Sequence, residues 1–204
     1  MDSGTIKDAI HTISSSLEIP AIIILILAVV VTLFQLGGVI VEYFVERRGK
    51  RPDVPRVLED IAGKAPEEMA DILKAGRFQG RQEDLFLRLL RSTAGVGEER
   101  KLLAIQLLSQ EEARLNRRIA ITDIIARIGP MFGLMATLIP LGPGLIALGR
   151  GDTHALADSL LTAFDATVAG LAAAGVAFII SKVRKRWYQA DLATVETILE
   201  GVVL

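Results

Sequence analysis

Asp165 is the one acidic residue inside the last long apolar segment of this chain, between Asp158 and Lys182. An ionisable side chain within a membrane is costly and usually serves ions or protons. Sixteen uncharged residues separate Asp165 from Lys182, which is about 24 Å of helix and less than the roughly 30 Å hydrocarbon core. We therefore predict that Asp165 lies in the outer leaflet and handles ions. The alternative is an interfacial Asp165 whose carboxylate reaches water.

Two threonines supply hydroxyl groups in the apolar segments. Thr137 lies ten residues after Arg127, and Thr167 lies fifteen residues before Lys182. Measured from these charged residues, the depths of the two threonines differ by only about 7 Å along their helices. Both hydroxyls could therefore line one wet zone that an ion crosses. Asp165 does not share the face of Thr167, because two residues correspond to about 200° around a helix.

Three apolar segments must position these side chains. The runs Ile19 to Val41 and Ile128 to Leu148 carry no charge, and each exceeds the roughly 20 residues that span a membrane. Basic clusters at residues 47–51 and 182–186 follow the first and third segments. Because cytoplasmic ends are rich in Lys and Arg, we expect the N-terminus outside and the C-terminus in the cytoplasm.

The predicted fold is all-α: an integral membrane protein with three transmembrane helices and a helical cytoplasmic domain. The N-terminal segment is either a helix on the membrane surface or a frayed end. No helix breaker occurs from Glu98 until Gly129, which favours one helix running from the cytoplasm into the second span. The expected parts are an outer segment (1–18), transmembrane helix 1 (19–45), the cytoplasmic domain (46–126), transmembrane helix 2 (127–149), an outer loop (150–157), transmembrane helix 3 (158–181) and a cytoplasmic C-terminal helix (182–204).

Composition narrows the function. The 204 residues have a net charge of -1 and no cysteine, so no overall basicity indicates nucleic acid as a partner, and thiolate catalysis is excluded. The only histidines, His11 and His154, lie far apart in sequence. No serine has a plausible His and Asp partner, and the glycine pairs lack a phosphate-binding context. We expect no enzyme activity, no metal and no cofactor.

Small residues recur at a spacing of four in the second and third segments. Gly129, Gly133 and Thr137 form one such row, and Ala166, Gly170 and Ala174 form the other. Such rows let helix backbones approach closely in lipid. They suit either packing within one chain or contacts between subunits. The nearby Pro140 and Pro143 free backbone carbonyls, which should be buried in protein or face a wet cavity.

The second and third segments resemble those of the MotA/TolQ/ExbB proton channel family. In the second, Pro130, Gly133, Leu134 and Thr137 match the family pattern Pro-x-x-Gly-Leu-x-Gly-Thr. Ala136 stands where that pattern has its second glycine. In the third, residues 167–174 resemble the family's Thr-x-x-Gly-Leu followed by small residues. Three spans, with a cytoplasmic domain after the first, are similar to the TolQ and ExbB branch.

This resemblance implies the channel or stator subunit of an ion-driven, energy-transducing complex in the inner cell membrane. It implies a homopentamer whose second and third helices surround single-span partner helices similar to ExbD or TolR. The partner would bring the ion-carrying aspartate, and Thr137 and Thr167 would face the pore. Asp165 lies outside the matched pattern and would then sit at a subunit contact. A non-conducting scaffold that recruits a protein through its cytoplasmic helices is the alternative.

Overall fold

The computed structural model describes residues 3–47, 53–76, 78, 80–91 and 98–203, and every regular element in them is helical. The chain divides into two compact units. One comprises residues 1–37 and 120–182, and we call it the membrane unit. The other comprises residues 38–119 and 183–204. We call it the cytoplasmic unit after the location that the sequence predicts for most of it.

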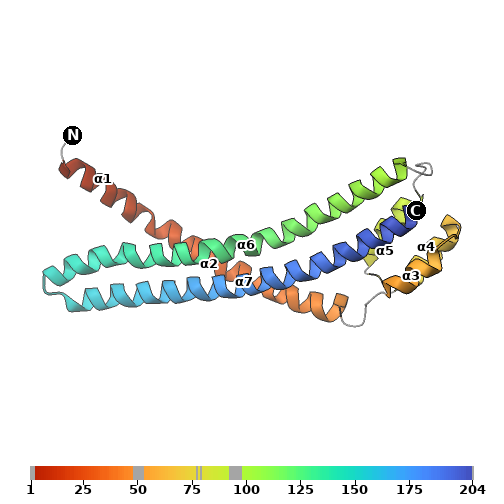
Figure 1. Cartoon of the computed structure of the whole chain (residues 1–204). Helices are drawn as coiled ribbons and strands as arrows, with labels where there is room; N and C mark the ends of the chain where they lie inside the picture. Colours follow the sequence, from red (N-terminus) through yellow and green to blue (C-terminus); the bar gives the residue numbers. More distant parts are fainter. Residues whose placement is uncertain (1–2, 48–52, 77, 79, 92–97, 204) are drawn as a thin grey trace. The chain divides into compact units, whose positions relative to one another are not determined.

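The membrane unit is built on apolar helices. They are α1 (Ser3–Ser16), α2 (Glu18–Val41) and parts of α6 (Glu98–Gly149) and α7 (Thr153–Val203). Three helical stretches of the described chain are long and apolar enough to span a membrane: Thr12–Val45, Glu98–Gly149 and Thr153–Val202. In Figure 1, α6 and α7 run antiparallel from the short turn that joins them. The all-α prediction with three apolar, membrane-length helices is therefore confirmed.

Helix α6 is continuous although it contains Pro130, Pro140 and Pro143. The lack of a breaker after Glu98 favoured one helix into the second span, and Gly129-Pro130 does not interrupt α6. Each proline removes one backbone hydrogen bond, and a helix in lipid tolerates this where its neighbours cover the freed carbonyl. Pro140 is buried and Pro143 is exposed. The carbonyl that Pro143 leaves without its helical hydrogen bond belongs to Ile139, which is half-buried.

The connection between α6 and α7 is shorter than the loop expected over residues 150–157. Helix α7 already begins at Thr153, because the Asp152 carboxylate accepts a hydrogen bond from the Ala155 N–H at 2.9 Å and so caps the first turn. Gly151 has a φ of 86°, a backbone conformation that glycine adopts at little cost. The sequence prediction missed this cap, because it placed the start of the third helix at Asp158, where the long apolar segment begins.

The cytoplasmic unit is a small helical domain. The π-helix η1 (Glu42–Arg47) follows α2, and α3 (Val54–Ile61), α4 (Pro66–Ala75) and α5 (Gly80–Arg91) come next. Helix α4 starts with a proline and has the acids Glu67 and Glu68 in its first turn, residues that favour a helix N-terminus. The core joins these short helices to residues of α6 and α7 that belong to this unit. Phe86 is fully buried there with its ring 5.2 Å from that of Phe78.

Candidate ion pathway

The small residues of α6 and α7 face one another within a single chain. A Cβ atom added to Gly170 would lie 2.9 Å from the Gly129 carbonyl oxygen and 3.1 Å from the Gly133 Cα. One added to Gly129 would lie 3.0 Å from the Ala174 Cβ. At Gly133 the nearest atoms are 3.6 Å away, an ordinary contact. Pro130 is half-buried beside them. Within this chain, the small residues thus let the backbones of α6 and α7 approach closely.

The hydroxyls of Thr137 on α6 and Thr167 on α7 lie beside the same turn of α6. Thr137 Oγ1 donates to the Leu134 carbonyl at 2.6 Å. Thr167 Oγ1, on α7, lies 3.4 Å from the Gly133 carbonyl and 3.3 Å from the Ala163 carbonyl. The acceptors Gly133 and Leu134 are consecutive residues. The close approach at the glycines therefore brings two hydroxyl groups to one level of the bundle, and both side chains stay partly accessible.

Asp165 lies on a different face of α7. Its side chain is exposed, and so are the apolar side chains one turn away on either side, Leu161 and Val168. A carboxylate flanked by exposed apolar groups is poorly suited to contact lipid. This face of α7 therefore needs water or another protein chain next to Asp165, and it is separate from the face that carries Thr167.

A buried ion pair in the cytoplasmic unit was missed by the sequence analysis. The Arg184 Nε lies 3.3 Å from Glu42 Oε2, and both side chains are less than a tenth exposed. Glu42 falls within residues 19–45 expected for the first span, so Asp165 is not the only acid within the expected spans. The signal that could have revealed this pair is an isolated glutamate directly after a long uncharged run, with an arginine in a basic cluster elsewhere.

Tyr188 completes this cluster. Its hydroxyl donates to Glu42 Oε2 at 3.4 Å. Burial raises the pKa of Tyr188 above 10.0, and the negative charge of Glu42 raises it further, while Arg118 and Arg184 act in the opposite direction. The phenol therefore stays protonated at physiological pH and remains a hydrogen-bond donor to Glu42.

The membrane unit holds two further polar features that sequence reasoning passed over. Ser181 donates to Asp123 Oδ1 at 3.1 Å, and Asp123 also pairs with Arg127 at 2.8 Å. On α2, the hydroxyl of Thr32 is buried without a hydrogen-bond partner among the described residues. These groups lie in segments whose average hydropathy conceals single polar residues, so only packing identifies which of them are buried.

The described residues contain no group of three or more His, Asp or Glu side chains that could hold a metal. A cavity of about 230 Å³ in the cytoplasmic unit is lined by residues of both charges, including Arg81, Glu111, Arg114 and Asp191. Arg114 pairs with Glu111 at 2.8 Å. The lining also includes the phenol of Tyr188, and it contains no histidine, serine or threonine.

Comparison with protein families yields one match. The model of the MotA/TolQ/ExbB proton channel family matches residues 64–197, well over half of the chain. No curated protein matches the chain. The matched region includes the glycine row, both threonines and Asp165, as well as Arg184 and Tyr188 of the cytoplasmic cluster.

Proposed function

Because the chain belongs to the MotA/TolQ/ExbB proton channel family, we propose that it is the channel subunit of a complex that converts an ion gradient into mechanical work. Members of this family are channel and stator subunits and not enzymes. The chain is accordingly a multi-pass membrane protein with three candidate spans. Family membership implies a complex with a partner similar to ExbD or TolR.

The observation that carries the proposal is the pair of hydroxyls at one turn of α6. The hydroxyl oxygens of Thr137 and Thr167 lie at consecutive backbone carbonyls, those of Leu134 and Gly133. Asp165 is the only charged residue in the two apolar segments that carry them. A carboxylate on a partner helix at that level would find hydroxyl groups able to exchange hydrogen bonds as it gains and loses an ion. This chain thus supplies the polar lining, and the partner supplies the ion-carrying acid.

We propose a homopentamer around the partner helices, in the inner cell membrane with the N-terminus outside. The exposed apolar faces of α6 and α7, with Leu134, Leu138, Leu161 and Val168 among them, provide surface for neighbouring subunits and lipid. Each ion that crosses 100 mV releases about 2.3 kcal/mol. Several ions in each work step would therefore rotate or rearrange the partner.

Thr137→Val and Thr167→Val test the lining, because valine keeps the shape and removes the hydroxyl. We expect either change to lower proton flux into proteoliposomes about tenfold, a loss similar to one hydrogen bond in the transfer step. Flux would be measured with the complex purified together with its single-span partner. Native mass spectrometry of the same samples should show five copies of the chain with each variant.

Thr194→Val is the matched control, since its hydroxyl donates only to the Ala190 carbonyl of its own helix, at 3.1 Å, outside the predicted spans. It should leave flux unchanged. Full flux in both test variants would refute the proposed lining. A complex that binds a partner but conducts neither protons nor sodium ions would instead indicate the scaffold function.

A further inference from the structure

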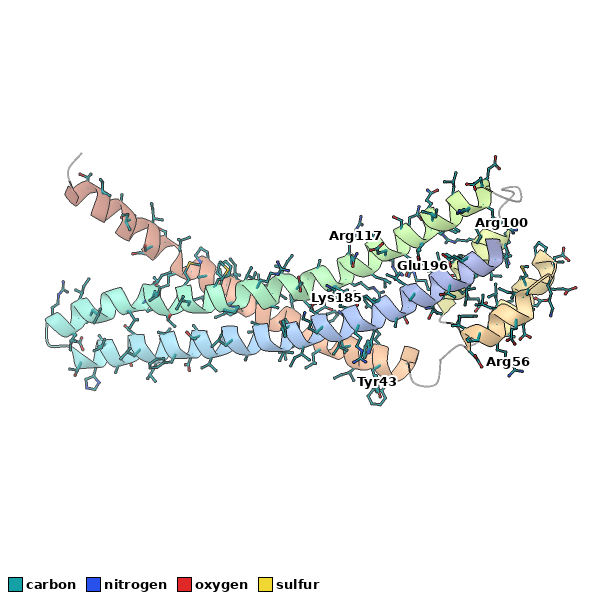
Figure 2. All side chains as sticks on the ribbon, viewed as in Figure 1. Tyr43, Arg56, Arg100, Arg117, Lys185 and Glu196 are labelled. Carbon is teal, nitrogen blue, oxygen red and sulfur yellow. The ribbon has the colours of Figure 1, made fainter. Side chains whose placement is uncertain are left out.

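An aromatic and basic surface lies where the first and third spans are expected to reach the cytoplasm, and the ion pathway makes no use of it. On η1, Tyr43, Phe44 and Val45 are 52%, 55% and 68% exposed. On α7, Lys185 and Arg186 are exposed and Trp187 is half-buried. We call these six residues of the cytoplasmic unit the inner patch; Tyr43 and Lys185 are labelled in Figure 2.

The patch is held together by defined contacts. The rings of Tyr43 and Trp187 stack with centroids 6.1 Å apart and planes at 21°, and Phe44 meets Tyr43 edge-on at 5.4 Å. The buried pair of Glu42 and Arg184 fastens η1 to α7 directly beside them. Removing either Glu42 or Arg184 would leave a buried charge without its partner, which is strongly destabilising. We therefore expect this ion pair to keep η1 against α7 beside the stacked rings.

The position of the patch along the chain matches the level of lipid headgroups. Val45 ends the candidate span Thr12–Val45, and Trp187 follows Lys182, the first charge after the third apolar segment, by about 8 Å of helix. Tyrosine and tryptophan concentrate at this level because one end of each ring prefers apolar surroundings and the other is polar. Trp187 is the single tryptophan of the chain.

The patch carries two exposed basic side chains, Lys185 and Arg186. Arg184 is paired with Glu42, but among the described residues neither Lys185 nor Arg186 has an acidic partner within ion-pair distance. The segment 182–187 contains no acid. Two exposed cations beside exposed aromatic and aliphatic surface complement a molecule that joins a negative headgroup to hydrocarbon.

We propose that the inner patch binds an anionic phospholipid of the inner leaflet. Lys185 and Arg186 contact the lipid phosphate, and Tyr43, Phe44 and Val45 lie along the upper acyl chains. A protein occupant fits less well, because the centre of a protein interface is depleted of lysine. Membrane orientation explains basic residues at this level, but it does not require an aromatic stack braced by a buried ion pair.

Fluorescence of Trp187 tests this proposal directly, since no other tryptophan contributes. The full chain would be reconstituted in phosphatidylcholine vesicles with increasing fractions of phosphatidylglycerol brominated near the headgroup end of its acyl chains. Brominated phosphatidylcholine provides the reference. We expect brominated phosphatidylglycerol to reach half-maximal quenching at a mole fraction about three- to tenfold lower.

The double variant Lys185→Gln and Arg186→Gln should abolish this preference and keep the quenching by brominated phosphatidylcholine. Arg56→Gln with Lys101→Gln is the matched control, because it removes two exposed charges outside the patch and should preserve the preference. Equal quenching of the unmodified protein by the two lipids would overturn the proposal. So would emission that neither lipid quenches, which would show that protein covers Trp187, and so would a preference that survives the double variant.

Discussion

The hydroxyl of Tyr188 donates to the carboxylate of Glu42 inside the cytoplasmic unit. The pKa of Tyr188 therefore reports whether its hydroxyl is buried beside Glu42. The chain has only two tyrosines, Tyr43 and Tyr188, so Tyr43→Phe leaves a single phenol to observe. In that variant the midpoint of the tyrosinate absorbance should lie above pH 10.0, because burial and the charge of Glu42 raise the pKa of Tyr188.

The direction of the resulting pH dependence follows from linkage. A pKa raised in the folded state means that the stabilisation is complete below the unfolded value and is lost as pH rises through the folded pKa. The same titration in denaturant should therefore have a lower midpoint, and Glu42→Gln should lower the native midpoint. Equal native and denatured midpoints would contradict the burial of this hydroxyl.

Asp165 poses a separate question at the residue scale, because its exposed carboxylate has apolar neighbours. Asp165→Asn removes the charge and nearly preserves the shape. If Asp165 helps ions to enter from outside, flux should fall severalfold while native mass spectrometry still shows the intact oligomer. Loss of the oligomer at unchanged flux per remaining complex would mark Asp165 as a subunit contact. Asp158→Asn, at the outer start of the third span, serves as the control.

At the scale of elements, the pairing of α6 with α7 depends on Gly170. Gly170→Ala would place a methyl group 2.9 Å from the Gly129 carbonyl oxygen, which is backbone and cannot move aside alone. We expect the helix pair to lose about 1–3 kcal/mol of stability, the usual effect of overpacking. Denaturation of the protein in detergent, followed by circular dichroism, would measure the change.

Gly175→Ala controls for the general effect of alanine in this helix, since nothing lies within 4 Å of its added Cβ. It should be neutral or slightly stabilising, because alanine favours helix over glycine. Gly133→Ala should also be tolerated at its 3.6 Å clearance. If Gly170→Ala is as stable as Gly175→Ala, α6 and α7 do not pack in the manner described.

At the scale of the whole molecule, the basic clusters predict how the chain crosses the membrane. The chain has no cysteine, so introduced thiols report without background. With an impermeant maleimide on intact cells, Thr5→Cys and Thr153→Cys should react, because both are expected outside. Lys101→Cys should react only after the cells are opened. Labelling of Lys101→Cys in intact cells, with protection of the other two, would reverse the proposed topology.

The sequence by itself determined the membrane class, the three apolar helices and the family pattern around Thr137 and Thr167. Apolar length and small-residue spacing are local properties, and the surrounding lipid enforces helical structure on such segments. The start of α4 at Pro66 was likewise evident, because proline and first-turn acids act within one helical turn.

Only the tertiary structure decided which polar groups meet. Glu42 and Arg184 are 142 residues apart, and Ser181 and Asp123 are 58 apart, so no local pattern links either pair. The tight contacts at Gly170, and the looser ones at Gly133, depend on how α6 and α7 are rotated about their axes. Hydropathy is an average over many residues, so it does not show how the helices are rotated. Burial and partners follow from the packing of helices, and packing involves segments distant in the chain.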